Sequence, residues 1–213
     1  MINGVVFDAF GTTMRIAQRM NPYRDLIREG RRQGVALTSM TTHIVMTSNL
    51  SLDEIASKLG ISLTSAKRAK LIHALEMELS SIEPYPDALE AISMLQSAGV
   101  KVGICSNLAS PYGPVVRNLF RTIDGHAFSF ELGIMKPDPD IYNAICLQMD
   151  VVPGHCFSEK TGRVLMIGDS PRCDRDGPRA VGILGFHLDR SDQCNIHDLV
   201  QFAELVLHRN YSH

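Results

Sequence analysis

Short apolar runs alternate with amphipathic segments along most of this chain. Apolar runs bounded by turn residues are typical of buried strands, and apolar positions that recur every three to four residues are typical of helices. This alternation favours βαβ units, so we expect an α/β fold with a doubly wound parallel sheet. The expected strands are residues 4–8, 100–105, 127–130, 164–167 and 183–187. The expected helices between and after them are residues 87–98, 111–120, 139–149, 172–181 and 196–207.

One long polar block interrupts the alternation between the first strand and the rest. It carries almost no strand signal. Ser51 and Glu54 have the spacing of a capping box, and Gly60 provides a stop for the helix that they begin. The periodicity of the block predicts three helices, at residues 22–33, 51–59 and 64–80.

This block is therefore expected to be an insert rather than part of the sheet. It ends at Glu83-Pro84-Tyr85-Pro86, a stiff segment that helices do not cross easily. We expect a small all-helical cap formed by residues 14–84. The α/β core would then consist of residues 1–13 and 85–213.

Composition narrows the function classes. The formal net charge is −2, which gives no sign of a nucleic-acid partner or a membrane surface. The chain begins directly in a strand pattern and has no apolar stretch long enough to span a bilayer. We expect a cytoplasmic protein with a small-molecule substrate; the oligomeric state is left open. Its five cysteines show no paired spacing and are expected to be reduced: Cys105, Cys146, Cys156, Cys173 and Cys194.

Acidic residues follow two of the predicted strands. Asp8 ends the first apolar run, just before Gly11-Thr12, and Asp169 follows the run that ends at Ile167. Ligands of open α/β sheets bind outside the carboxyl ends of the strands, so both carboxylates are expected at one edge. A site built around a cation would explain why they are brought together.

Four fragments at strand ends carry a resemblance to a known family. They are Asp8-Ala9-Phe10-Gly11-Thr12, Cys105-Ser106-Asn107, Lys136-Pro137-Asp138, and Gly168-Asp169-Ser170 with Asp174. In order and spacing they resemble the four motifs of the haloacid dehalogenase superfamily of hydrolases. The helical insert lies where that superfamily places its C1 cap, and the resemblance implies a Rossmann-like core.

The resemblance also implies a role for each motif. Asp8 would attack an electrophilic centre and form a covalent aspartyl intermediate. Ser106 would hydrogen-bond the transferring group, and Lys136 would neutralise charge on the nucleophile and the substrate. Thr12 and Asn107 would complete the phosphate-binding set.

A Mg²⁺ site follows from the same resemblance. Asp169 would hold Mg²⁺ together with Asp8 and the backbone carbonyl of Phe10, while Asp174 and Ser170 would support the site. Mg²⁺ prefers few carboxylates and several waters, which fits this sparse set of ligands.

Phe10 departs from the phosphatase pattern of the superfamily, which places an aspartate two residues after the nucleophile as general acid and base. A phenyl ring cannot protonate a leaving alkoxide. Dehalogenases of the superfamily have an aromatic residue there, because halide leaves without a proton, but they generally lack the acid of the fourth motif that is kept here as Asp169. We favour Mg²⁺-dependent hydrolysis of a small phosphorylated substrate, with 2-haloacid dehalogenation as the alternative.

Two other classes of protein are alternatives to an enzyme, namely a binding protein and a DNA-binding protein. Phe10 also suits a catalytically weak member of the family that serves as a binding protein. Residues 51–70 resemble a helix-turn-helix, which suggests DNA binding, but they lack the basic flank that nucleic-acid binders usually show. Arg31 and Arg32 are expected to form the exposed face of a cap helix.

Overall fold

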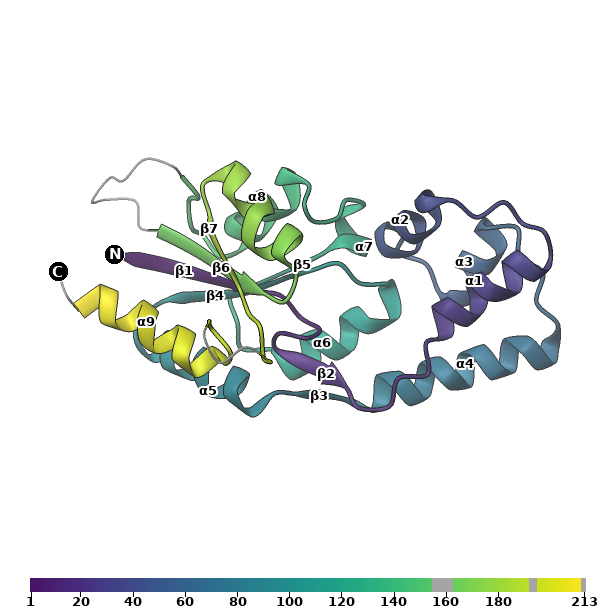
Figure 1. Cartoon of the computed structure of the whole chain (residues 1–213), viewed down its shortest axis with the longest axis horizontal. Coiled ribbons are helices and arrows are strands. Elements are labelled where there is room, and N and C mark those ends of the chain that lie inside the picture. Colours follow the sequence, from purple (N-terminus) through teal and green to yellow (C-terminus); the bar gives the residue numbers. More distant parts are fainter. Residues whose placement is uncertain (155–162, 192–194, 212–213) are drawn as a thin grey trace.

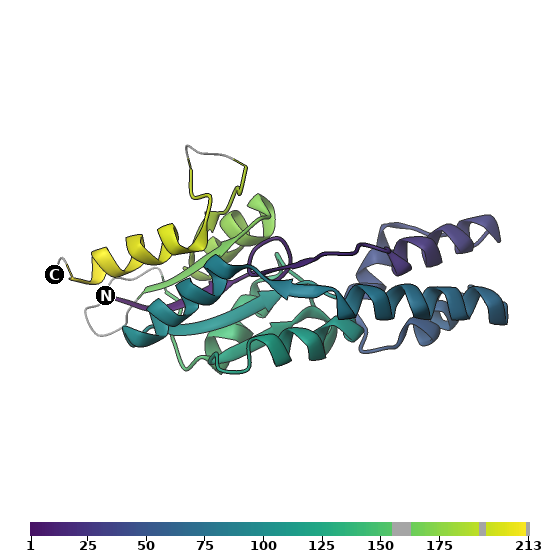
Figure 2. The ribbon, with the colours of Figure 1, turned by 90° about the horizontal axis from the view of Figure 1, so that it is seen from below.

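The computed structural model describes residues 1–154, 163–191 and 195–211 (Figure 1). A central sheet with helices on both faces forms one end of the molecule, and a cluster of helices forms the other. Both chain ends lie at the end of the sheet that is remote from the helical cluster (Figures 1 and 2). The strands run toward that cluster, so their carboxyl ends face it.

The sheet has five parallel strands in the order β5-β4-β1-β6-β7. Strand β1 is central, and its Phe7 is in register with Ile104 on one side and Ile167 on the other. The side chains of the inner strands are buried, as expected where helices cover both faces of a parallel sheet. The strands are β1 (Ile2–Phe7), β4 (Lys101–Ser106), β5 (Gly125–Phe128), β6 (Arg163–Gly168) and β7 (Leu184–His187).

Alternate side chains of β1 enter two different hydrophobic clusters. Val5 and Phe7 pack with the helices of one face, while Val6 packs on the other. The first face is covered by α5 (Pro86–Ser97), α6 (Gly113–Leu119) and α9 (Leu199–Tyr211), and the second by α8 (Pro139–Gln148). The expected doubly wound α/β core is confirmed.

Four helices form the cap beyond the carboxyl edge of the sheet (Figure 2). The capping box of Ser51 and Glu54 forms as expected at the start of its helix. The second cap helix was not expected, because its β-branched residues and threonines hide the helical period. It begins with a capping box of its own, between Thr38 and Thr41. The helices are α1 (Pro22–Arg32), α2 (Ser39–Thr47), α3 (Leu52–Lys58) and α4 (Ser65–Ser80).

A short antiparallel pair joins the cap to the core. Strand β2 (Met14–Ile16) pairs with β3 (Ile82–Pro84), and the Tyr85 N–H donates to the Thr13 carbonyl at 3.0 Å. The pair holds the outgoing and returning chain segments together. The expected limits of the insert, residues 14 and 84, lie within it.

Two elements that follow strands of the sheet differ from expectation. The strand expected at 127–130 is β5, which ends at Phe128, and Ser129–Leu132 form the short helix α7 that stops at Gly133. The helix expected at 172–181 is instead a π-helical turn (Pro171–Asp176) followed by a 3₁₀ turn (Gly177–Val181). Pro178 lacks the N–H that would continue an α-helix.

The structure also bears on the cysteines and on membrane insertion. Cys105, Cys146 and Cys173 are free thiols, whereas Cys156 and Cys194 lie outside the described residues. Within the described ranges, every helix is too short or too polar to cross a bilayer.

Candidate active site

Residues that follow the strands meet at the carboxyl edge of the sheet. Asp8 comes directly after β1, Ser106 ends β4, and Asp169 comes directly after β6. Lys136 reaches the same edge from the loop after α7. The parallel register of the three strands is what brings these distant segments together.

Lys136 is the centre of the buried network. Its Nζ donates to Asp8 Oδ1 at 2.6 Å and to Asp174 Oδ1 at 2.7 Å, and the residue is only 3% exposed. Burial opposes the charge on Lys136, but the two carboxylates outweigh it and hold the pKa of the ammonium well above its usual value. Lys136 therefore stays charged and fixes Asp8 and Asp174 on either side of it.

Asp8 has two oxygens in different surroundings. Ser106 Oγ donates to Oδ1 at 3.0 Å, and Lys136 Nζ donates to the same atom. Among the described residues, no donor reaches Oδ2. Oδ2 is therefore the oxygen that remains available for a bond to another group.

Thr12 and Asn107 are engaged with neighbouring protein groups. Asn107 Oδ1 accepts from the Lys136 backbone N–H at 2.7 Å, and its Nδ2 donates to the Lys136 carbonyl at 2.9 Å. The Asp169 N–H donates to Thr12 Oγ1 at 3.1 Å. These contacts hold the lysine loop and the two aspartate loops in place, and phosphate contacts for Thr12 and Asn107 stay a prediction.

Three carboxylates converge at this edge. Each of three residues contributes one carboxylate oxygen, and these three oxygens lie within 4.8 Å of one another: Asp8, Asp169 and Asp174. Partial burial and the charge of Asp8 raise the pKa of Asp169. Burial, with a smaller contribution from Asp8, raises the pKa of Asp174 to about 6 against the opposing charge of Lys136.

Two glycines make this convergence possible. Gly11 has a φ of +86°, and a Cβ built there would collide with the Asp169 carboxylate. A Cβ at Gly168 would collide with the carboxylate of Asp174. A side chain at either position would push an aspartate out of the cluster.

The donor set fits a hard divalent cation. Lys136 neutralises part of the charge of Asp8 and Asp174, but Asp169 forms no ion pair with any described residue. Three carboxylates and one ammonium leave an excess of negative charge at the edge. Oxygen ligands of this kind are those that Mg²⁺ uses. Asp8 and Asp169 would hold the ion, with Asp174 and Ser170 beside them; the Ser170 N–H donates to Asp174 Oδ2 at 2.9 Å.

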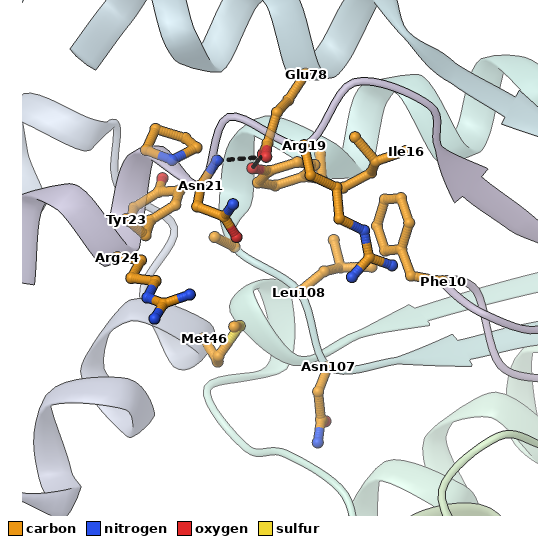
Figure 3. Close-up of a pocket in the computed structure, with 13 residues that line it drawn as sticks. Phe10, Ile16, Arg19, Asn21, Tyr23, Arg24, Met46, Glu78, Asn107 and Leu108 are labelled. Atoms are coloured by element: carbon orange, nitrogen blue, oxygen red, sulfur yellow. Dashed lines mark hydrogen bonds between the residues drawn. The ribbon is translucent and has the colours of Figure 1, made fainter.

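A cleft of about 300 Å³ lies between this edge and the cap (Figure 3). Phe10 and Asn107 line it from the core. The Phe10 ring packs edge-on against Tyr112, with the ring centroids 5.7 Å apart. The loops after β1 and β4 thus form part of the cleft wall, although Asp8 and Ser106 themselves are not among the described residues that line it.

Sequence analysis missed four residues around this cleft. Glu78, Tyr112, Arg19 and Arg24 all line it. Glu78 could have been noticed, because it occupies an apolar position of α4 whose other buried members are Leu71, Ala74 and Leu75. The other three gave no sequence signal, because nothing in their local pattern shows that they face a cleft.

Arg190 is a fifth residue that the sequence did not reveal, and it stabilises the loop after β1 that carries Asp8. Arg190 donates to the Thr12 carbonyl at 2.6 Å and to Asp87 at 3.0 Å, and its guanidinium lies 3.9 Å from the centre of the Tyr85 ring. It thereby connects the loop after β1 to the start of α5. Arg32, by contrast, pairs with Glu29 in α1, and neither Arg31 nor Arg32 lines the cleft.

A model of the haloacid dehalogenase-like hydrolases matches residues 2–182. The chain belongs to this family. Its expected resemblance is thereby confirmed over most of its length.

Two curated relatives share part of the sequence. The chain is 32% identical over 119 residues to the uncharacterized protein YMR130W of Saccharomyces cerevisiae, covering 51% of this chain and 39% of the relative. It is 36% identical over 80 residues to (S)-2-haloacid dehalogenase 4A of Burkholderia cepacia, covering 36% of this chain and 35% of that protein. The matches thus span less than half the length of either relative.

Solved structures of the family share the fold. A HAD phosphatase from Thermococcus onnurineus is similar, with a TM-score of 0.65 and 18% identity over 96% of this chain and 98% of that one. A 2-haloacid dehalogenase from Pseudomonas syringae pv. Tomato DC3000 has a TM-score of 0.63 and 16% identity over 98% of this chain and 99% of that one. Since both activities occur among the neighbours, the fold leaves the reaction open.

Proposed function

We propose that this hydrolase cleaves a small phosphate ester with the help of a divalent cation, most simply Mg²⁺, through a covalent intermediate on Asp8. The observation that carries the proposal is the cluster of Asp8, Asp169 and Asp174, whose oxygens lie within 4.8 Å of one another around one buried ammonium. Like charges this close resist ionisation together unless further positive charge is supplied. A bound cation would supply that charge and would polarise the phosphoryl group.

The residues of the chain then perform the transfer. Asp8 Oδ2 attacks phosphorus, the bond between phosphorus and the ester oxygen breaks, and the alkoxide leaves with the bonding electron pair. Lys136 and Ser106 hold Asp8 Oδ1, so the attacking oxygen keeps a fixed direction. Water then hydrolyses the aspartyl phosphate, which releases phosphate and restores the carboxylate.

Phe10 affects the relative rates at which different phosphate esters are hydrolysed. Its ring cannot donate a proton to the alkoxide, so the leaving oxygen takes one from water. We therefore infer that esters with acidic leaving groups are hydrolysed faster than alkyl esters.

Phe10 also favours a second candidate, hydrolysis of a carbon–halogen bond. Asp8 Oδ2 would attack carbon, halide would leave without a proton, and water would cleave the ester that forms on Asp8. The partial match to (S)-2-haloacid dehalogenase 4A supports this alternative. The unpaired Asp169 counts against it, because an extra carboxylate beside the nucleophile assists neither the attack nor the departure of halide.

A substrate panel with and without metal separates the two reactions. Purified protein would be assayed on phosphate monoesters and on 2-haloacids, with Mg²⁺ and with EDTA, beside Asp8→Asn as the inactive control. We expect phosphate release that depends on Mg²⁺ and on Asp8. Halide release that persists in EDTA, with no phosphate release from the panel, would overturn the proposal in favour of dehalogenation.

A further inference from the structure

Two backbone carbonyls of the loop after β1 are held by a side chain from a distant segment. Arg190, which follows β7, donates from Nη2 to the Thr12 carbonyl at 2.6 Å and from Nε to the Gly11 carbonyl at 3.4 Å. Among the described residues, no other group donates a hydrogen bond to either carbonyl. This part of the loop that begins at Asp8 therefore depends on Arg190 for its support.

The guanidinium of Arg190 is itself held in one orientation. It forms a two-pronged contact with the carboxylate of Asp87 in the first turn of α5, with N–O distances of 3.0 and 3.3 Å. It also lies 3.9 Å from the centre of the Tyr85 ring. A planar guanidinium that is fixed by a carboxylate and an aromatic face has little freedom left. Arg190 is therefore a rigid support rather than a mobile surface side chain, and it is only 26% exposed.

The part of the loop that Arg190 supports also contacts Asp169. The Asp169 N–H donates to Thr12 Oγ1 at 3.1 Å, and Thr12 is fully buried. Gly11 comes so close that a Cβ there would collide with the Asp169 carboxylate. Since Asp8 begins the same loop, a shift of Gly11 and Thr12 would change the separation between the carboxylates of Asp8 and Asp169.

Asp169 depends on this backbone contact more than Asp8 does. Asp8 is paired with Lys136, whereas Asp169 forms no ion pair within the part of the chain that the structure describes. The backbone of Asp169 has two contacts, the hydrogen bond to Thr12 and a contact of its carbonyl with His187 Nε2 at 3.2 Å. Of these two contacts, the one to Thr12 connects Asp169 to the loop that carries the nucleophile.

We propose that Arg190 is a positioning residue for the cation site. It acts through Thr12: by holding the Thr12 carbonyl, it keeps Asp169 at the distance from Asp8 at which both carboxylates can bind one divalent cation. This role rests on the cation site of the proposed function, but not on the reaction proposed there. Groups that orient the ligands of a metal without touching it typically contribute about 10–100-fold to metal affinity.

Mn²⁺ binding tests the role of Arg190. Electron paramagnetic resonance of the free ion would give the dissociation constant for wild type, Arg190→Gln and Arg190→Lys, at a temperature where all three are folded. We expect the affinity to fall by about tenfold or more in Arg190→Gln. Arg190→Lys keeps the charge and can donate to one carbonyl but lacks the planar fork, so it should recover part of the affinity.

Turnover gives a second measurement on the same variants. With 4-nitrophenyl phosphate as substrate, Arg190→Gln should need about tenfold more Mn²⁺ than wild type to reach half of its maximal rate. At saturating Mn²⁺ its KM for the ester should stay near the wild-type value, because Arg190 contacts the loop backbone and not the substrate. A merely structural contribution would lower the unfolding temperature without changing the metal dependence, so thermal unfolding would be measured in parallel.

Arg15→Gln is the matched control. Arg15 also lies over the Tyr85 ring, at 5.9 Å, and its guanidinium pairs with the Glu83 carboxylate at 2.6 Å. In the described structure it donates to neither the Gly11 nor the Thr12 carbonyl. Its replacement should therefore leave the affinity for Mn²⁺ unchanged.

The possible failures are distinguishable. A wild-type protein that binds no divalent cation would overturn both the cation site and the role of Arg190. Binding by wild type with the same affinity in Arg190→Gln and Arg190→Lys, or an equal loss in Arg15→Gln, would overturn the role of Arg190 alone. Weaker binding in the Arg190 variants without turnover of any ester by wild type would support that role and refute the proposed reaction.

Discussion

At the scale of single residues, Phe10 is the side chain that most constrains the chemistry. It stands two positions beyond the proposed nucleophile, lines the cleft and packs on Tyr112 at 5.7 Å between ring centroids. An acid in its place could protonate a leaving alkoxide, whereas the ring can only exclude water from one side of the site.

Replacing Phe10 by aspartate is predicted to increase the hydrolysis of alkyl phosphate esters by about tenfold or more, because general acid catalysis typically contributes 10²–10⁴-fold. The gain should be larger for alkyl than for aryl esters, since aryl oxides leave without full protonation. Steady-state kinetics over a series of leaving groups measures this. Phe10→Leu is the control for lost packing, and an unchanged rate for every ester in Phe10→Asp would show that leaving-group protonation is not the deficit.

The site residues differ in how far sequence alone could predict them. Asp8, Ser106 and Asp169 stand at strand ends, and the strand pattern places such residues at one edge of a parallel sheet. Arg19 and Arg24 could not be found in this way, because their position depends on how the cap packs on the core. Local sequence does not encode that packing.

At the scale of elements, the junction between α4 and the core depends on one buried carboxylate. Glu78 of α4 accepts three hydrogen bonds, from the backbone of Met20 and Asn21 and from the hydroxyl of Tyr112. Three donors would lose their acceptor if this side chain were removed.

Glu78→Ala is therefore predicted to lower the free energy of unfolding by about 3 kcal/mol, the scale expected when buried donors to a charged group are left unsatisfied. Urea denaturation followed by circular dichroism measures it. Glu76→Ala is the matched control, because Glu76 is exposed on the same helix, and it should change stability by less than about 0.5 kcal/mol. Equal stability of the two variants would contradict a structural role for Glu78.

The elements that sequence predicted well share one physical property. Continuous apolar runs such as 164–167 form strands that are buried on both faces of the sheet. Because burial on both faces requires apolar side chains at every position, such strands can be recognised in the sequence. Helix α2 and the β2–β3 pair escaped prediction. The pairing of β2 with β3 joins residues that are distant in the chain, and the β-branched residues of α2 obscure its period.

At the scale of the whole molecule, acid sensitivity offers a test that does not depend on the active site. His126 in β5 is 8% exposed, and its Nε2 has no hydrogen-bond partner among the residues that the structure describes. Burial, with a smaller contribution from Arg117, lowers the pKa of His126 to about 4. The folded protein thus keeps this histidine neutral where the unfolded chain, with a pKa of about 6.5, would protonate it.

His126 is therefore predicted to lower the free energy of unfolding by up to about 3 kcal/mol as the pH drops from about 6.5 to about 4. The unfolded state binds the proton more strongly across this range, so the sign is a loss of stability toward acid. Asp174, whose pKa is raised to about 6, acts in the opposite direction over this range, so the effect of His126 is measured as the difference between the wild-type and His126→Phe profiles. Urea denaturation at a series of pH values would be compared for wild type and His126→Phe. The variant should lose this part of the pH dependence, while the exposed-site control His73→Gln keeps it; identical profiles for all three proteins would refute the assignment.

The proposed reaction depends on a cation bound at the carboxyl edge of the sheet by the acidic residues that follow β1 and β6. The most direct measurement is a crystal structure grown with Mn²⁺, whose anomalous signal identifies the ion and its ligands. We predict one Mn²⁺ bound by Asp8 and Asp169. An edge without anomalous density at saturating Mn²⁺, or the two carboxylates directed into separate regions, would contradict the account.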